Sequence, residues 1–196
     1  MATRLPDVFA AGDCVATNHQ LLSETCLPLG TTAHKQGRVA GENALGGDRS
    51  FLGSLGTQVV KAFGIVAART GIRDHEAIPA GYEPRTVAST VDDHEASYPG
   101  SSAVHARTTG DLPAGRLLGV QMLGTIQAPS TSTSTASTAI HTALGCDQLN
   151  DLDLSYTPPL SSPWDILQTA VQRWNTDTRH HLWPSPPRPP PPGTTS

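Results

Sequence analysis

A series of short strand-like segments joined by tight turns constrains this chain more than any other feature of its sequence. The segment SLGTQVVKAFGIVAARTGI (54–72) is β-rich and partly alternating, and EPRTVASTVDD (83–93) follows as a further strand. HARTTGDLPAGRLLGVQMLG (105–124) predicts a hairpin that turns at Gly-Asp and Ala-Gly. Helical segments stand among the strands, at DHEAIPAGY (74–82) and STAIHTAL (137–144). Hairpin connections mixed with helices predict an α+β fold.

The C-terminal third combines one clear helix with two biased segments. SPWDILQTAVQRW (162–174) predicts an amphipathic helix, with apolar positions at Trp164, Ile166, Leu167, Ala170, Val171 and Trp174. The Ser/Thr run APSTSTSTAST (128–138) has little apolar surface to bury, so we expect it to form a loop or to fray. The Pro-rich end predicts a disordered tail over 176–196, in which PPRPPPP is a weak candidate for docking to an aromatic groove.

Composition excludes several classes of function. The 196 residues carry 13 Lys and Arg against 17 Asp and Glu, a formal charge of −4, with no basic stripe, so a nucleic-acid partner is not expected. No run approaches the ~20 apolar residues that cross a bilayer. With no apolar leader at the N-terminus, these features predict a cytoplasmic protein without a membrane partner.

The N-terminal block, PDVFAAGDCVATNH (6–19), predicts a buried strand over 6–13 that ends at Gly12-Asp13. A carboxylate that follows a strand is well placed to accept hydrogen bonds from ligand hydroxyls. A loop over 14–29 then leads to a helix that begins near Thr31 or Thr32 and stops at the two glycines after Leu45. The first N–H groups of that helix, with its dipole, suit a ligand that gains negative charge on reduction.

Four blocks in this order carry a family resemblance: PDVFAAGD, PLGTTAHKQGRVAGENALGG, FLGSLGTQVVKAFGIVAARTGI and LNDLDLSYTPPLSSPWD. Over residues 5–174 the chain resembles the C-terminal half of the FAD-dependent pyridine nucleotide-disulphide oxidoreductases. It is most similar to the branch of coenzyme A-disulphide reductase and NADH oxidase/peroxidase. The resemblance implies that 51–175 is the family's C-terminal dimerisation domain, and that 1–50 is the last strand-loop-helix of its FAD-binding α/β domain.

The same resemblance implies where the cofactor lies. Asp13 is expected to hydrogen-bond the ribityl chain of FAD, and the start of the 31–45 helix to point at the pyrimidine edge of the flavin, where its dipole stabilises the reduced anion. In intact relatives NAD(P)H supplies the hydride. The expected cofactor contacts are Gly12, Asp13, Leu29, Gly30, Thr31 and Ala33.

Two tyrosines are implied to complete the active site of the other subunit in a homodimer. Tyr98 in SYPG and Tyr156 in SYTPP match the family's pair beside the reacting sulfur, where each phenol donates a hydrogen bond to a thiolate or sulfenate. The alternative is that both tyrosines only pack at a subunit interface.

Departures from the family pattern leave the activity of the chain open. The block PDVFAAGD begins at residue 6 of this chain. In the family, the corresponding block comes after the Gly-x-Gly-x-x-Gly strand, the NAD(P)H domain and the redox-active cysteine. None of Cys14, Cys26 and Cys146 matches that cysteine, and their spacing predicts neither a metal finger nor a disulphide framework.

Three readings follow from these departures. In the first, the chain is part of an FAD-dependent oxidoreductase acting on a disulphide, peroxide or oxygen. In the second, it is a non-catalytic homodimerisation module from a truncated gene, and it binds no FAD because a ligand held by one edge loses most of its buried contacts. In the third, a separately encoded N-terminal half completes the fold. The first strand, without its sheet neighbours, is then expected to expose apolar surface.

Two other clusters have weaker interpretations. DDHE (92–95) carries metal-type side chains, but neighbours on a strand point to opposite faces, so we expect a solvated turn. His180-His181 stands at the start of the expected disordered tail, where no ordered metal site is expected.

Overall fold

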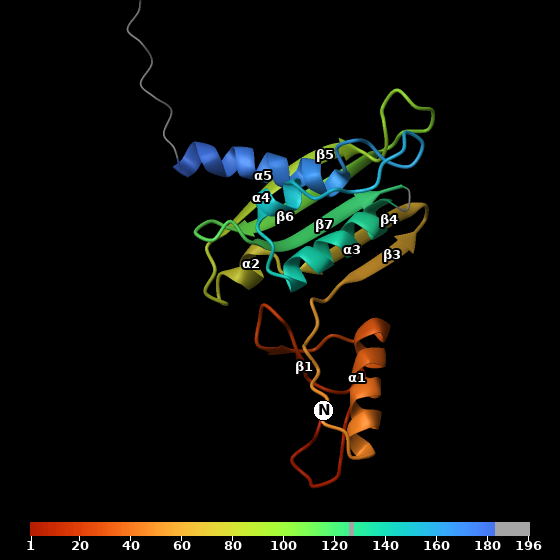
Figure 1. The fold of residues 1–196 in the computed structure, drawn as a ribbon, viewed down its shortest axis with the longest axis vertical. Coiled ribbons are helices and arrows are strands. Elements are labelled where there is room, and N and C mark those ends of the chain that lie inside the picture. Colours follow the sequence, from red (N-terminus) through yellow and green to blue (C-terminus); the bar gives the residue numbers. More distant parts are fainter. Residues whose placement is uncertain (126–127, 183–196) are drawn as a thin grey trace, which may run out of the picture.

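The computed structural model describes residues 1–125 and 128–182. Two units follow one another along the chain (Figure 1). An N-terminal unit contains the helix α1 (Gly30–Ala44), and a larger unit consists of an antiparallel sheet with helices on one face. No helix in the described part of the chain is long and apolar enough to span a bilayer.

The sheet has the order β3-β4-β7-β6-β5, and every neighbouring pair is antiparallel. The β-rich segment 54–72 forms a β3/β4 hairpin that turns at Phe63 and Gly64, which both have positive φ angles (50° and 84°), as a two-residue type I′ turn requires. The hairpin expected over 105–124 is confirmed, as are the strand at 83–93 and the helical turn α2 (Asp74–Ala77). The sheet strands are β3 (Gln58–Ala62), β4 (Ile65–Gly71), β5 (Pro84–Asp92), β6 (Ala103–Asp111) and β7 (Leu117–Gly124).

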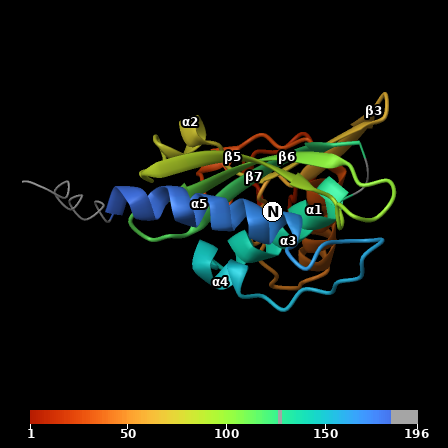
Figure 2. The same cartoon turned by 90° about the horizontal axis from the view of Figure 1, so that it is seen from above.

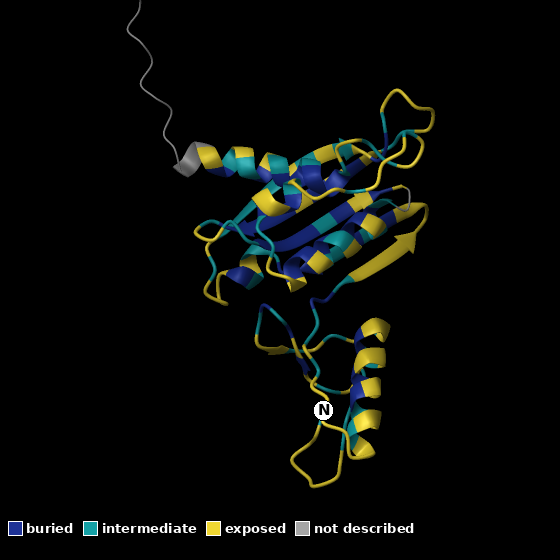
Figure 3. Ribbon diagram, viewed as in Figure 1, coloured by how far each residue is buried: buried dark blue, intermediate teal, exposed yellow. Residues whose placement is uncertain are grey.

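Three helices cover one face of the sheet (Figure 2). The helix α3 (Ala128–His141) packs on β4 and β7, whereas α5 (Ile166–Leu182) packs on β5 and β6, and α4 (Cys146–Asn150) contacts α5. The buried side chains concentrate between this layer and the sheet (Figure 3), and Leu21 of the N-terminal unit belongs to the same core. The largest fully buried apolar side chains are Ile72, Leu117, Leu118, Ile140, Leu149 and Leu167.

The expectation of a Ser/Thr loop over 128–138 is wrong, because this segment forms most of α3. Hydroxyl groups along it donate to the carbonyl four residues earlier, as Ser134 does to Ser130 (3.1 Å) and Thr138 to Ser134 (3.2 Å). Side chains this small also let the helix lie close to the sheet, so Ser132 and Ala136 are buried without any large apolar group. Thr133 is the exception, since its buried hydroxyl has no partner among the described residues.

The C-terminal helix also departs from expectation at both ends. Trp164 lies before α5 and is 61% exposed, whereas Asp165 caps the helix by accepting a hydrogen bond from the Leu167 N–H (2.7 Å). The tail expected from 176 is helical as far as Leu182, and Asp177 forms an ion pair with Arg85 on β5 (2.7 Å). His180 and His181 therefore belong to this helix, and the rest of the Pro-rich tail lies outside the described residues.

The strand expected over 6–13 does not form. Phe9 makes only an isolated antiparallel bridge to Ala2, because no other segment of the described chain offers a strand beside it. Leu5 and Val8 are exposed as expected for apolar residues that lack sheet neighbours. The rest of the unit is a small ladder of β1 (Thr17–Asn18) and β2 (Glu24–Thr25), followed by α1, which begins and ends as predicted.

A junction segment, residues 54–57, connects the two units through hydrogen bonds to both. On the N-terminal side, Ser54 exchanges backbone hydrogen bonds with Asn18 and Gln20 (both 2.9 Å), and its hydroxyl bonds that of Thr32 in α1 (3.0 Å). On the sheet side, the hydroxyl of Thr57 lies 2.7 Å from that of Thr70 in β4 and 3.0 Å from that of Ser137 in α3. These residues therefore help to fix how the N-terminal unit sits against the sheet, together with the Gln20–His141 hydrogen bond and the buried Leu21.

Gly71, where β4 ends against β7, is the position least able to accept a side chain. Its φ is +70°, and a Cβ there would collide with the carbonyl oxygen of Leu118. We expect Gly71→Ala to lower the free energy of unfolding by more than about 3 kcal/mol in urea denaturation.

The matched control is Gly37→Ala in α1, where an added Cβ meets nothing and the change should raise stability by about 0.5–1 kcal/mol. Equal effects of the two substitutions would contradict the close approach of β4 and β7.

Candidate functional site

The turn that carries Asp13 is a defined structure rather than the end of a strand. Gly12 has φ +96°, and the Val15 N–H donates to the Gly12 carbonyl (3.2 Å), which closes the turn just before β1. A Cβ on Gly12 would meet nothing within 4 Å, so glycine is favoured there by its backbone conformation and not by lack of space. The carboxylate of Asp13 is exposed at the tip.

Gln36, in the middle of α1, holds this turn. Its side chain is fully buried, its Oε1 accepts the Gly12 N–H (2.9 Å), and its Nε2 donates to the hydroxyl of Thr17 on β1 (3.0 Å). A buried amide that satisfies both partners is a strong positional constraint, because any shift would leave polar groups unpaired. Sequence reasoning missed Gln36; its place on the buried side of α1, with Thr32 and Val39, is the signal that indicates it.

The start of α1 presents bare backbone groups. Leu29 at the N-cap provides no side-chain cap, and its carbonyl accepts the N–H groups of Thr32 and Ala33 (both 2.9 Å). Within residues 1–125 and 128–182, no group accepts the N–H of Gly30 or Thr31. The helix end therefore keeps two donors and its dipole free for a negatively charged group.

The predicted cofactor contacts line two separate cavities. Asp13 lies in one of 310 Å³, whereas Leu29, Gly30 and Thr31 line another of 420 Å³ together with residues of β3 and α3. Gly12 contacts α1 through Gln36, and Ala33 lines neither cavity. The described chain thus holds the Asp13 turn against α1 without joining Asp13 and the helix start in one pocket.

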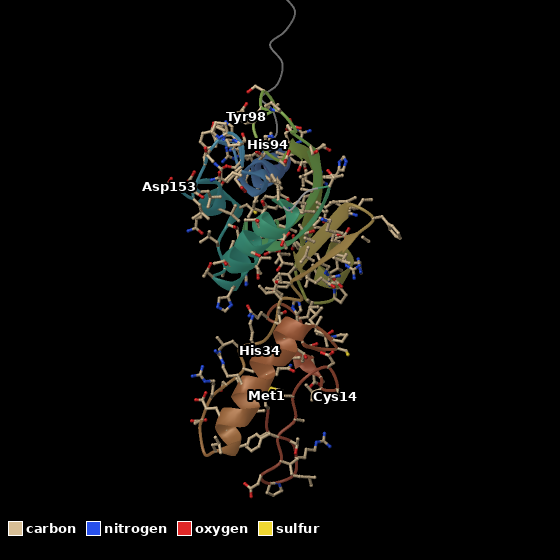
Figure 4. The ribbon with its side chains drawn as sticks, turned by 90° about the vertical axis from the view of Figure 1, so that its right-hand side faces the viewer. Met1, Cys14, His34, His94, Tyr98 and Asp153 are labelled. Atoms are coloured by element: carbon tan, nitrogen blue, oxygen red, sulfur yellow. The ribbon has the colours of Figure 1, made fainter. Side chains whose placement is uncertain are left out.

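Tyr98 and Tyr156 lie far from that turn. Their loops, β5–β6 and α4–α5, lie side by side at one end of the sheet (Figures 1 and 2), and both phenols are about half exposed, at 45% and 46%. The labelled positions of Tyr98 and Cys14 fall on opposite units of the chain (Figure 4). The structure therefore brings the two tyrosine loops together but keeps both away from Asp13.

The DDHE segment contains a buried pair where a solvated turn was expected. Asp93 is 5% and His94 8% exposed, with Asp93 Oδ2 2.9 Å from His94 Nδ1, while the Ser102 N–H donates to the other carboxylate oxygen. The hydrogen bond to Asp93 raises the pKa of His94. Burial raises the pKa of Asp93, but the hydrogen bonds from Ser102 and His94 outweigh it and leave that pKa below its ordinary value. The rings of Tyr98 and His94 pack edge to face, with their centroids 6.4 Å apart, so the Asp93–His94 pair supports the Tyr98 loop.

The cysteines divide into two kinds. Cys146 is completely buried at the start of α4, and burial, with the nearby charge of Asp147, raises its pKa to about 12. Cys14 and Cys26 are exposed, and both line the cavity of Asp13.

Comparison with known proteins identifies relatives over most of the chain. No protein-family model matches it. The NAD(P)H sulfur oxidoreductase (CoA-dependent) of Pyrococcus furiosus is 32% identical over 168 residues, which are 85% of this chain and 38% of the relative. The coenzyme A disulfide reductase of Staphylococcus aureus (strain Newman) is 29% identical over 168 residues, 84% of this chain and 37% of the relative. The chain thus spans less than two fifths of these curated relatives.

Solved structures agree with this placement. A NAD-dependent persulfide reductase from A. fulgidus superposes with a TM-score of 0.82 at 32% identity, over 88% of this chain and 32% of that one. The water-forming NADH oxidase of Lactobacillus brevis has a TM-score of 0.85 at 22% identity, over 91% and 40%, and shows the shared fold alone.

The comparisons thus support the resemblance to the pyridine nucleotide-disulphide oxidoreductases, over one part of the length of such proteins. The proteins to which the chain is similar include coenzyme A-disulphide reductases and persulphide reductases.

The Gln36 bridge gives a test of how the Asp13 turn is held. Gln36→Leu keeps the buried volume but leaves the Gly12 N–H and the Thr17 hydroxyl unpaired, so we expect a loss of about 1–3 kcal/mol in the free energy of unfolding. Hydrogen exchange at the Gly12 amide should accelerate. Arg38→Gln, on the exposed side of α1, is the control, and unchanged exchange at Gly12 in Gln36→Leu would refute the bridge.

The buried pair predicts a pH dependence of stability. Because the folded-state pKa of His94 is raised, its contribution is complete below the ordinary histidine pKa near 6.5 and is lost as pH rises through the raised value. We expect Asp93→Asn to lower the free energy of unfolding more at pH 6 than at pH 9, and to lower the His94 pKa in an NMR titration. An equal loss at both pH values would exclude a charged pair.

Proposed function

We propose that this chain supplies the flavin edge and the subunit-contact surface of an FAD-dependent NAD(P)H oxidoreductase that reduces a disulphide or persulphide of the coenzyme A type. The observation that carries the proposal is the 168-residue match to NAD(P)H-dependent sulfur and disulphide reductases, in a chain whose Asp13 turn is held against α1 by Gln36. Peroxide or oxygen is the alternative electron acceptor. It is the less favoured one, because the water-forming NADH oxidase shares only the fold with this chain.

The residues fit one edge of such a cofactor. The exposed carboxylate of Asp13 is an acceptor for ribityl hydroxyls, and the Gly12–Gln36 hydrogen bond fixes the turn that carries it. The free N–H groups of Gly30 and Thr31 are donors for a negatively charged ring edge, with Leu29 and Ala33 as the adjoining backbone. Held by Asp13 and the start of α1, FAD would supply two-electron redox chemistry between NAD(P)H and a disulphide.

We assign the two units to different roles. Residues 1–50 provide these cofactor contacts, and 51–175 form a dimerisation domain. Tyr98 and Cys14, the neighbour of Asp13, lie on opposite units (Figure 4), and Tyr156 belongs to the α4–α5 loop beside the Tyr98 loop (Figure 1), so the two tyrosines would serve the site of a second subunit rather than their own. There the phenols would donate hydrogen bonds to a developing thiolate, with the buried Asp93–His94 pair holding the Tyr98 loop. A homodimer in the cytoplasm is the expected setting.

Titration with FAD tests the cofactor edge. Because the described chain contacts the flavin from one side only, we expect weak, saturable quenching of flavin fluorescence rather than retention through desalting. Asp13→Ala should weaken binding about tenfold, the loss of a charged acceptor, whereas Asp48→Asn, in the exposed loop after α1, should not.

Three results would count against the proposal. The absence of quenching by a chain that still elutes as a dimer would favour a non-catalytic dimerisation module. Binding only after a separately produced N-terminal half is added would place the site across two polypeptides. Binding that Asp13→Ala leaves unchanged would remove Asp13 from the site.

A further inference from the structure

Cys14 and Cys26 come together at one end of the β1–β2 ladder. Thr17 pairs with Thr25 in this antiparallel ladder, so the residues just before β1 and just after β2 lie at the same end. Cys14 stands in the turn before β1, Cys26 follows β2 directly, and both line the 310 Å³ cavity beside Asp13. Two thiols that are 12 residues apart in sequence therefore face one accessible space.

Both thiols are open to a reagent, and the elements that carry them are anchored. The Cys14 thiol makes only a weak hydrogen bond to the Ala11 carbonyl (3.7 Å), and both cysteines are exposed. The turn of Cys14 is held through Gln36, which also bonds β1 at Thr17. The adjustment to the Cα–Cα distance of about 4.4–6.8 Å that a disulphide needs would come from the exposed Cys26 segment after β2, because the Cys14 turn is held by Gln36.

The cavity has a negative lining. Asp13 and Glu24 contribute two carboxylates, and no Lys, Arg or His lines it among the described residues. A metal ion is not its natural occupant, because no group of three His, Cys, Asp or Glu in the described part of the chain is placed to hold one. Two thiols suffice for exchange with a disulphide, and the carboxylates would attract a reagent that carries positive charge.

We propose that Cys14 and Cys26 form a reactive dithiol that reduces small cationic disulphides by thiol–disulphide exchange. The inference goes beyond the proposed flavin chemistry and does not depend on it. One thiolate attacks a disulphide R–S–S–R, forming a protein–S–S–R bond and releasing RS⁻, which takes up the proton lost by the attacking thiol. The second thiolate then attacks the protein sulfur of that bond, which forms the Cys14–Cys26 disulphide and releases the second RSH. The protein loses two electrons, and R–S–S–R gains them to become two thiols.

Intact-mass spectrometry of the reduced, flavin-free chain treated with cystamine tests the dithiol. We expect wild type to release two cysteamine thiols per chain and to end about 2 Da lighter, without an adduct. Cys14→Ser and Cys26→Ser should each release one thiol and keep one cysteamine adduct. Cys146→Ala is the matched control and should behave as wild type, because that thiol is buried with a pKa near 12.

Other outcomes would overturn the proposal. Wild type that stops with two stable adducts would mean that the thiols react independently. Peptide mapping that finds Cys146 in the bridge would assign the chemistry elsewhere. Circular dichroism of the serine variants identifies any that fail to fold, and the wild-type mass result decides the question without them.

The charge of the cavity has its own test. Cystamine should react about tenfold faster than an anionic disulphide such as oxidised glutathione at low salt, and the ratio should fall as ionic strength rises. Glu24→Gln should reduce the preference, whereas Glu95→Gln, in the β5–β6 loop, should not. Equal rates for the two reagents would remove the carboxylates from the proposal and leave an unselective dithiol.

Discussion

The hydrogen bonds of residues 54–57 are the constraint on which the arrangement of this molecule depends. Ser54 belongs to the N-terminal unit through its backbone contacts with Asn18 and Gln20, and Thr57 belongs to the sheet through Thr70 and Ser137. Leu55 lies between them, with its carbonyl accepting the N–H of Gly71, where β4 ends. Together with Leu21, which is buried in the core of the sheet unit, this segment gives the Asp13 turn a defined position relative to the sheet.

Much of the sheet unit was predictable because its information is local. Turn residues, alternation and β-branched side chains are properties of a few neighbouring positions, and the hairpin over 105–124, the strand character of 54–72, β5 and the helix α1 all follow from them. The absence of the strand expected over 6–13 was not predictable from local sequence, because a β-strand forms only beside another strand. In the described chain, Phe9 pairs with Ala2 alone. The sequence has the composition of a strand there without the pairing that would make it one.

The predictions of a Ser/Thr loop over 128–138 and of a solvated turn at DDHE were wrong for a different reason. Composition indicates how much apolar surface a segment offers, but not whether its polar groups find partners inside the fold. The exposed hydroxyls of Ser134 and Thr138 bond carbonyls of their own helix, and Asp93 bonds His94 and Ser102, so most of these polar groups have partners within the fold. The same limit applies to the site: sequence reasoning found Asp13 and the start of α1, but not Gln36, because a single buried amide leaves no periodic pattern.

The sequence of α3 has one more consequence, for how its position along the sheet is fixed. In a run that alternates serine and threonine, sliding the helix by one residue would offer the sheet almost the same surface, so the hydroxyl positions alone do not define the register. The non-repeating residues must do so: Ile140, 1% exposed, fills the core at one end, and Pro129 is buried against Gly124 at the other. His141 adds a hydrogen bond to Gln20 of the N-terminal unit (3.0 Å). The helix is thus aligned at both ends, and in its middle by the fully buried Ala136 and by the Ser137 hydroxyl that bonds Thr57.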